Sequence, residues 1–283
     1  MEIDISIIVP FYNGNKYINK LIKSVNDSVK ITSYKCELII VKDSMDDEVE
    51  YNKDNYSMDI KIIKNKTNLG IHHSRVVGIE NALGKYVMML DQDDLIAEQC
   101  IESQMNSIGT NDMVIGNGFD ESRQELIYSS LSQQKLALNE KYYYYIGCMI
   151  TSPGQCLIKK DAIPSIWTKK FIKNNGSDDL LLWLLMFNHR KKMVINNHIC
   201  YTHVATGENI SDSFSTLYTS CQEVLKYLEK YDSVNRHYKR ILENRLEMRR
   251  MYEGKFKIFK ILAMIVHPKI TLALIIKKAK GRF

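Results

Sequence analysis

The feature that most constrains the fold is a regular alternation of apolar runs with helical periods over residues 4–90. Residues 4–10 are almost continuously apolar, which is typical of a strand covered on both faces. Residues 17–25 then repeat apolar positions at a helical spacing. Further strands are expected at 36–43, 58–65 and 85–90, and a further helix at 70–83. Strands that alternate with helices need crossover connections, so an α/β fold with a mostly parallel central sheet flanked by helices is expected.

Polar residues follow three of these strands at the point where each strand ends. Residues 10–13 end the first strand, residues 43–47 follow the second, and residues 91–94 follow the fourth. In sheets of this kind, ligands bind beyond the carboxyl ends of the strands. We therefore expect the three segments to form one shared site.

Asp91, Asp93 and Asp94 place three carboxylates within four residues, directly after an apolar strand. Like charges this close repel one another and are costly to remove from water. A polar turn is one explanation, and for Asp94 a cap on the following helix remains open. A divalent cation, or a cation that carries a phosphate, is the more specific explanation, because it would neutralise the carboxylates.

The pattern is less regular after residue 94. Helices are expected at 96–108 and 177–189, strands at 111–119, 125–131 and 192–204, and two amphipathic helices between 213 and 253. Ser177 or Asp178 is placed to cap the helix at 177–189. Because no internal repeat or low-complexity linker interrupts the chain, we expect one domain at 1–211 and a C-terminal helical extension at 212–283.

Composition indicates a globular protein and limits the cellular compartments in which the chain is expected. The 283 residues are 45% hydrophobic and 25% charged, which is enough to bury a sizeable core. The six cysteines form no Cys-x-x-Cys pair, so buried free thiols in a reducing compartment are expected rather than zinc or disulfides. The first residues carry acids and no basic segment, so no signal peptide is expected and a cytoplasmic location follows.

The net charge of +6 is concentrated at the C-terminus, because no acid follows Glu253 whereas eight basic residues do. The near-neutral remainder argues against a nucleic-acid partner. The apolar clusters in the tail at 254–283 are too short and too broken for a membrane-spanning helix. We expect this basic amphipathic tail to lie on an anionic membrane surface. The alternatives are a helical lid packed on the domain and a homodimer surface.

The order of motifs resembles the family-two glycosyltransferases, which have the Rossmann-like GT-A fold. The segments that carry the resemblance are VPFYNG at 9–14, VKDSMDD at 41–47, NLGIHHSRVVG at 68–78, ALGKYVMMLDQDD at 82–94, SDDLLLW at 177–183, and His203 in YTHVATGENIS. The chain departs from the family pattern at Lys42, Ser44 and Val76. The resemblance covers residues 1–211 and implies a nucleotide-sugar half at about 1–95 and an acceptor half at about 96–211.

The resemblance also implies a role for each matching residue. Asp93 would hold Mn²⁺ or Mg²⁺, with Asp91 as a further metal contact. His203 would contact the metal or the diphosphate, and for His203 a purely structural role is the alternative. Asp43 would read the base, which makes a uridine donor the default, and Tyr12 would stack on it. The implied donor-binding residues are Pro10, Phe11, Tyr12, Asp43, Asn68, Arg75, Asp91, Gln92 and Asp93. For Arg75 a surface salt bridge is the alternative, and for Asn68 a purely structural role in a turn.

Asp179 is the expected general base. In an inverting transfer, a carboxylate takes the proton of the acceptor hydroxyl as it attacks the anomeric carbon. A helix N-terminus is expected to lower the pKa of Asp179 and keep it ionised. Simple capping of the helix by Asp178 and Asp179 is the alternative.

The predicted activity is therefore transfer of a hexose or N-acetylhexosamine from a nucleotide-diphosphate donor to a glycan or lipid-linked glycan. The resemblance places it in bacterial surface-polysaccharide synthesis, peripheral on the inner face of the cell membrane. A nucleotidyltransferase is disfavoured, because PFYNGNKY is not the Gly-rich basic loop that binds a triphosphate. A non-catalytic homologue that binds a nucleotide-sugar or a membrane partner remains an alternative, since Lys42 alters a family motif.

Overall fold

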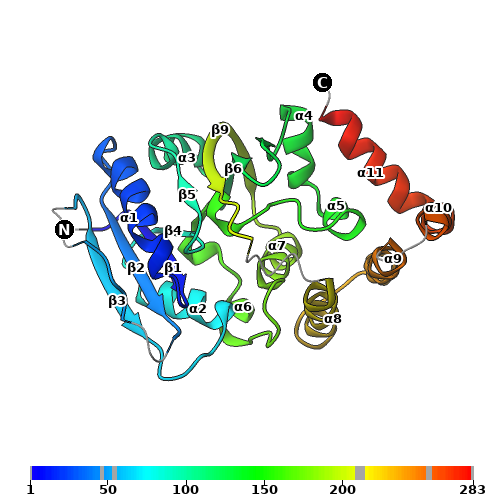
Figure 1. Cartoon of the computed structure of the whole chain (residues 1–283), viewed down its shortest axis with the longest axis horizontal. Coiled ribbons are helices and arrows are strands. Elements are labelled where there is room, and N and C mark those ends of the chain that lie inside the picture. The colour runs from blue at the N-terminus through cyan, green and yellow to red at the C-terminus, as the bar shows by residue number, and fades with distance from the viewer. Residues whose placement is uncertain (1, 45–47, 53–55, 208–213, 253–256, 282–283) are drawn as a thin grey trace.

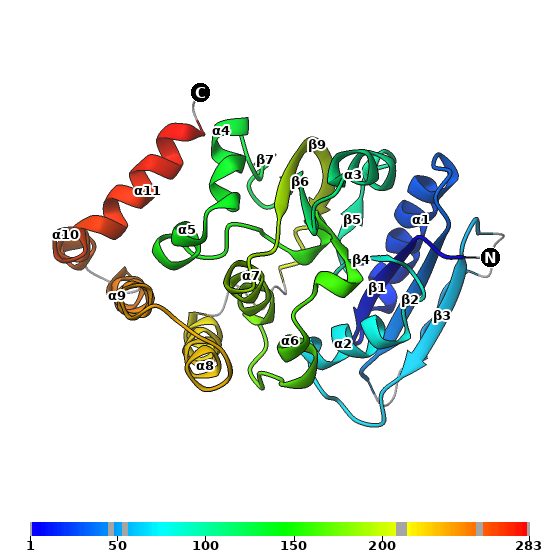
Figure 2. The same cartoon turned by 180° about the vertical axis from the view of Figure 1, so that it is seen from behind.

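The computed structural model describes residues 2–44, 48–52, 56–207, 214–252 and 257–281. Helices lie on both sides of one central sheet, and the C-terminal helices lie at the end of the molecule far from the N-terminal strands (Figures 1 and 2). The expected boundary at 211/212 and the start of the tail at 254 lie outside the described residues. The division into domain and extension therefore stays a prediction.

The sheet has the strand order β3-β2-β1-β4-β8-β6-β9-β5, with β7 paired to β6. The strands are β1 (Ile5–Phe11), β2 (Cys36–Lys42), β3 (Asp59–Lys64), β4 (Tyr86–Met89), β5 (Leu95–Ile96), β6 (Met113–Asp120), β7 (Glu125–Leu126), β8 (Cys156–Lys159) and β9 (Met193–His203). β1 to β4 run parallel to one another, β8 runs antiparallel to β4 and β6, and β6 and β9 are parallel. The expected α/β fold with a mostly parallel sheet is confirmed.

Eleven α-helices occur among the described residues. They are α1 (Asn15–Lys30), α2 (Ile71–Asn81), α3 (Cys100–Ile108), α4 (Leu131–Gln134), α5 (Glu140–Tyr145), α6 (Ser165–Lys169), α7 (Asp178–Asn188), α8 (Phe214–Tyr231), α9 (Arg236–Tyr252), α10 (Lys257–Val266) and α11 (Pro268–Lys280). α1 and α3 pack on one face of the sheet, and α2 and α7 belong to the core on the other face. Within the described residues, no helix has both the length and the apolar character needed to cross a bilayer.

The long elements lie where the sequence predicts them, and the short ones do not. β5 and β8 were not expected, and the strand predicted at 125–131 is reduced to the two residues of β7. Ser177 occupies the N-cap position of α7 as expected, but its side chain makes no capping hydrogen bond. Short strands carry too few residues to display a period, so sequence patterns find them poorly.

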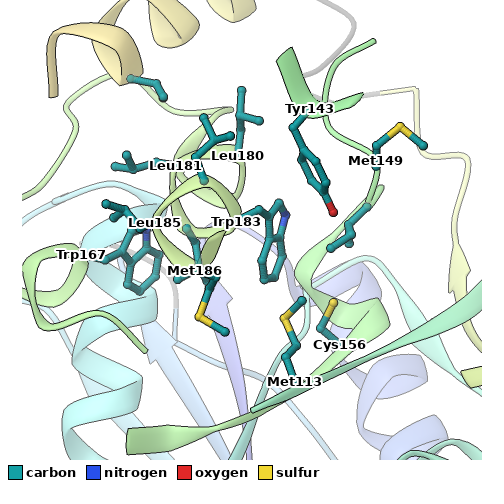
Figure 3. Packing of buried hydrophobic residues seen from close by; sticks show 14 of the residues in the cluster. Met113, Tyr143, Met149, Cys156, Trp167, Leu180, Leu181, Trp183, Leu185 and Met186 are labelled. Atoms are coloured by element: carbon teal, nitrogen blue, oxygen red, sulfur yellow. The ribbon is translucent and has the colours of Figure 1, made fainter. Parts of the chain in front are cut away.

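Helix α7 is apolar on all sides and forms the centre of the larger core. Residues 180–186 are at most 3% exposed. Figure 3 shows Trp183 packed among Met113, Tyr143 and Cys156. A helix that is hydrophobic all round has to be buried. Trp183 is therefore a core residue, and α7 presents its N-terminal carboxylates from a rigid position.

Helix α2 packs closely on β1 at Gly78, and this contact gives a testable prediction. A Cβ at Gly78 would lie 2.2 Å from Cγ2 of Ile8, which is fully buried. We expect Gly78→Ala to lower the free energy of unfolding by about 1–3 kcal/mol through overpacking, although Ala favours helix. Urea unfolding would measure the change.

The control is the same substitution in an Ile8→Ala background. Ile8→Ala lowers stability by itself but removes the clashing atom. Gly78→Ala should then cost nothing further, because the two residues interact directly. An equal cost in both backgrounds would contradict the contact.

Candidate active site

A cavity of about 620 Å³ opens beyond the carboxyl ends of β1, β2 and β4, within the usual range for small-molecule sites. It is lined by every site residue predicted from the sequence: Pro10, Phe11, Tyr12, Asp43, Asn68, Arg75, Asp91, Gln92, Asp93, Asp179 and His203. Residues from the start of α7 and from the end of β9 thus meet those at the strand ends. The fold brings together segments that are more than 150 residues apart in the sequence.

Gln92 fixes the loop after β1 to the loop after β4. Its Oε1 accepts a hydrogen bond from the main-chain N–H of Tyr12 at 2.8 Å, and its Nε2 donates to the Tyr12 carbonyl at 2.9 Å. The Gln92 amide thus holds the main chain of Tyr12, whose side chain is 51% exposed. Phe11 borders the cavity but is fully buried in the core, so its ring is not offered to a ligand. Tyr12 is the residue of this loop that can stack on a base.

Asp43 is held at the cavity by three hydrogen bonds and keeps capacity for another. Oδ1 accepts from Asn65 Nδ2 at 2.7 Å and from the Leu69 N–H at 2.9 Å, while Oδ2 accepts from the Gly70 N–H at 2.8 Å. A carboxylate offers about four acceptor sites, so Oδ2 can accept one further N–H. Asn68 is exposed, and its Oδ1 also accepts from Gly70 at 3.2 Å, which fits a turn-forming role.

Arg75 joins the two sides of the cavity. Its guanidinium is 3% exposed, with Nη2 2.5 Å from Asp91 Oδ1 and Nη1 2.5 Å from Asp178 Oδ2. Burial by itself would lower the pKa of Arg75, but Asp178 and Asp91 raise it above its ordinary value. Asp91 also accepts from Ser152 Oγ at 3.0 Å. Arg75 therefore forms salt bridges, as the alternative expected, but these salt bridges are buried and not on the surface.

Asp93 is a partly buried carboxylate that lies close to two others, Asp94 and Asp91. Burial, with the nearby Asp94 and Asp91, raises the pKa of Asp93 to about 6. Its Oδ2 lies 3.5 Å from Thr206 Oγ1, a long hydrogen bond. In the part of the chain that the structure describes, no three His, Cys, Asp or Glu side chains form a ready-made metal cage. Mg²⁺ and Mn²⁺ commonly take one or two carboxylates and complete their shell with water and phosphate, which this donor set fits.

Asp94 orients His203 instead of capping a helix. α3 begins at Cys100, so the capping alternative was wrong. Asp94 is 1% exposed and accepts hydrogen bonds from Tyr201 Oη and, at 3.0 Å, from the Val204 N–H. His203 Nδ1 lies 3.2 Å from Asp94, and this hydrogen bond raises the pKa of His203 to about 8. A carboxylate on one ring nitrogen is the usual support for a histidine whose other nitrogen binds a metal.

The two carboxylates at the start of α7 have different environments. Both line the cavity, but Asp178 is buried in its ion pair with Arg75, whereas Asp179 is partly exposed. Asp179 accepts from the Leu180 N–H at 2.6 Å and lies 3.6 Å from Cys148 Sγ. Burial and the neighbouring Asp178 raise the pKa of Asp179 to about 7, against the opposing effect of Arg75. The expectation of a lowered pKa was therefore wrong, because burial outweighs the helix N-terminus.

Glu223 on α8 holds a loop that borders the cavity, and no sequence motif indicated it. It accepts hydrogen bonds from the Lys173 N–H at 2.7 Å, the Asn174 N–H at 2.9 Å and Asn174 Nδ2 at 2.7 Å. The next residue, Asn175, lines the cavity and accepts from the Ile71 N–H at 3.3 Å. The contact joins residues about 50 apart in the sequence, so no local pattern reports it.

We expect Glu223→Ala to loosen the loop that leads into α7. Loss of an acceptor for three hydrogen bonds should lower the free energy of unfolding by about 1–3 kcal/mol and speed proteolysis within residues 170–177. Thermal unfolding and limited proteolysis would measure both effects. Glu229→Ala on the same helix is the control, since it removes only a salt bridge with Lys239. Equal effects of the two variants would deny Glu223 this role.

The known proteins that this chain resembles in sequence include two bacterial glycosyltransferases. A glycosyltransferase of Haemophilus influenzae without an assigned activity is 27% identical over 239 residues, which cover 80% of this chain and 76% of the relative. The UDP-Glc:alpha-D-GlcNAc-diphosphoundecaprenol beta-1,3-glucosyltransferase WfgD of Escherichia coli is 24% identical over 214 residues, which cover 74% of this chain and 80% of the relative.

A solved structure shares the fold. Residues 1–349 of Staphylococcus aureus TarS, in complex with UDP-GlcNAc, superpose with a TM-score of 0.63 at 18% identity, covering 92% of this chain and 76% of that one. This likeness identifies the fold as GT-A. The family model described as glycosyl transferase family 2 matches residues 6–167, which is more than half of the sequence. The chain therefore belongs to glycosyltransferase family 2.

Proposed function

We propose that this chain is an inverting, metal-dependent glycosyltransferase. It moves a hexosyl or N-acetylhexosaminyl group from a nucleoside-diphosphate donor to a hydroxyl of a glycan or lipid-linked glycan. The observation that carries the proposal is that Asp91, Asp93 and Asp179 line one cavity from two elements far apart in sequence. In-line displacement requires the leaving group and the general base to be held in the same cavity.

A uridine donor is the default. The remaining acceptor site on Asp43 Oδ2 suits the imide N–H of a uracil-type base, and the exposed Tyr12 can stack on it. The TarS structure holds UDP-GlcNAc, and the E. coli relative is named for UDP-Glc. Both names support a uridine nucleotide for this chain.

The electrostatics of the cavity support a divalent metal, Mn²⁺ or Mg²⁺. The carboxylates that line the cavity are Asp43, Asp91, Asp93, Asp94, Asp178 and Asp179. Arg75 also lines the cavity, but its guanidinium already forms ion pairs with two of these carboxylates. A diphosphate would be repelled by such a surface. Asp93, with Asp91 and His203 nearby, would hold the metal, whose chemistry is to neutralise the charge on the leaving diphosphate.

Asp179 is the proposed base. Asp178 cannot serve, because it is buried in its ion pair with Arg75. Asp179 lines the cavity, and its pKa of about 7 suits a group that takes up the acceptor proton near neutral pH. Cys148 and the Leu180 N–H hold its carboxylate in place.

The acceptor and the location form part of the same proposal. The E. coli relative is named for an acceptor linked to diphosphoundecaprenol, which supports a lipid-linked glycan in bacterial surface-polysaccharide synthesis. All six cysteines are free, which suits a reducing compartment. We therefore propose a cytoplasmic enzyme that works at the inner face of the cell membrane.

Donor binding should depend on metal and on Asp93. Calorimetry with uridine, guanosine and thymidine diphosphate sugars, with and without Mn²⁺, should give metal-dependent binding of one nucleotide class. Asp93→Ala should weaken this binding by about 100-fold or more, because the leaving diphosphate loses its cation. Asp161→Ala is the control, since that carboxylate is 74% exposed and is not among the residues that line the cavity. If the folded protein binds no donor at all, the non-catalytic alternative becomes the better account.

Asp179→Asn should retain donor binding and reduce transfer by about 10²–10⁴-fold, because the amide cannot take the acceptor proton. In the unsubstituted protein, protonation of Asp179 should reduce transfer about tenfold for each pH unit below its pKa of about 7. Product formation with the donor found by calorimetry would measure both effects, with Asp161→Asn as the control. Undiminished transfer by Asp179→Asn would remove this residue from its role.

A further inference from the structure

The last two helices leave a large apolar surface without cover from the described residues. We call it the outer face; it comprises Ile261, Leu262, Met264, Ile265 and Val266 of α10 with Leu272, Leu274 and Ile275 of α11. These side chains are 40–69% exposed. The two helices lie at the end of the molecule far from β1, β2 and β3 (Figures 1 and 2). Exposed apolar side chains in this number on two helices that contact each other indicate an interaction site.

The outer face is not needed to hold α11 on the protein. Ile270 and Ala273 are buried where α11 contacts α4 and α5, and Ser129 Oγ donates to the Gly281 carbonyl at 2.7 Å. Leu272 and Ile275 follow that buried pair by two residues each, which is about 200° around a helix. One side of α11 therefore packs on the protein, as the packed-helix alternative expects, and the opposite side is apolar as well.

The positive charges near the outer face indicate which kind of partner it can bind. Lys269, Lys278 and Lys280 are exposed on α11, and no acidic residue follows Glu253 in the sequence. A two-fold dimer through this face would bring each set of lysines close to its copy, which is unfavourable. An anionic lipid surface accepts both features, because apolar side chains enter the headgroup region while lysines stay among the phosphates.

We propose that the outer face of α10 and α11 docks on an anionic lipid membrane. The inference deepens the proposed function by naming its membrane partner, and it rests on that function only for the lipid-linked acceptor. The proposed contact is reversible and salt-dependent, because lysines contribute to it through electrostatic attraction to anionic lipids. Docking would hold the protein on the surface in which a lipid-linked acceptor lies.

The test uses the full chain and vesicles of phosphatidylcholine alone or in equal mixture with phosphatidylglycerol. Co-sedimentation should give binding to the mixed vesicles that weakens with added salt. Ile265→Glu combined with Ile275→Glu should reduce this binding about tenfold or more, since two inserted apolar side chains are lost. Lys269→Gln combined with Lys278→Gln should also weaken binding and should reduce its dependence on salt.

The matched control applies the same change to exposed apolar residues elsewhere. Ile31 and Leu83 are 52% and 71% exposed and lie outside the outer face, so Ile31→Glu with Leu83→Glu should leave vesicle binding unchanged. Unchanged thermal midpoints would establish that each variant is folded. Metal-dependent donor binding by the Ile265→Glu, Ile275→Glu protein should equal that of the unsubstituted chain, which separates this inference from the proposed function.

Three results would overturn the proposal. They are equal binding to both kinds of vesicle, binding that survives the paired glutamates, and no binding to either vesicle by the unsubstituted chain. A concentration-dependent dimer that the paired glutamates dissociate would assign the outer face to a second copy of the chain instead. Vesicle binding without any donor binding would leave the docking surface intact and reject the proposed enzyme.

Discussion

The buried guanidinium of Arg75 is the contact on which the arrangement of the cavity depends. It pairs with Asp91 after β4 and with Asp178 at the start of α7, and it is 3% exposed. Without it, two carboxylates would be left unpaired in a poorly solvated place, which costs several kcal/mol. The pair of bonds therefore fixes the acidic segment after β4 relative to the helix that carries Asp179.

The other carboxylates of the cavity differ in their hydrogen-bond partners and in their pKa values. Asp43 accepts three hydrogen bonds from main-chain and amide donors, and Asp94 accepts from Tyr201 and the main chain of Val204. The pKa values of Asp93 and Asp179 are instead raised, to about 6 and about 7, chiefly by burial. In the proposed mechanism these two are the groups that gain a partner during the reaction, one a metal and the other a proton.

Sequence reasoning predicted the long elements and the shared edge because both follow from local pattern. Apolar runs predicted β1, β2 and β4, and residues 10–13, Asp43 and residues 91–94 at their ends do line one cavity. Ser44 is not part of the lining, and residues 45–47 of the same expected segment lie outside the described residues. No such pattern indicated the hydrogen bonds of Gln92 to Tyr12 or those of Glu223 to the loop before α7. The raised pKa of Asp179 likewise had no signal in the sequence. The two sets of hydrogen bonds depend on atoms brought close from about 50 or more residues away, and periodicity carries no information at that separation. The pKa of Asp179 depends on how deeply the folded chain buries it, which the local sequence does not report.

By itself, the sequence determined an α/β protein with acidic residues at the carboxyl ends of its strands and an acid-free, lysine-rich tail. Only the tertiary structure decided that, of the two carboxylates that line the cavity, Asp178 is buried in an ion pair with Arg75 and Asp179 is partly exposed. It likewise decided which side of α11 is covered and which apolar side is exposed. Adjacent residues of a helix differ only in direction, and the packing around the helix determines whether that direction meets a partner, a cavity or solvent.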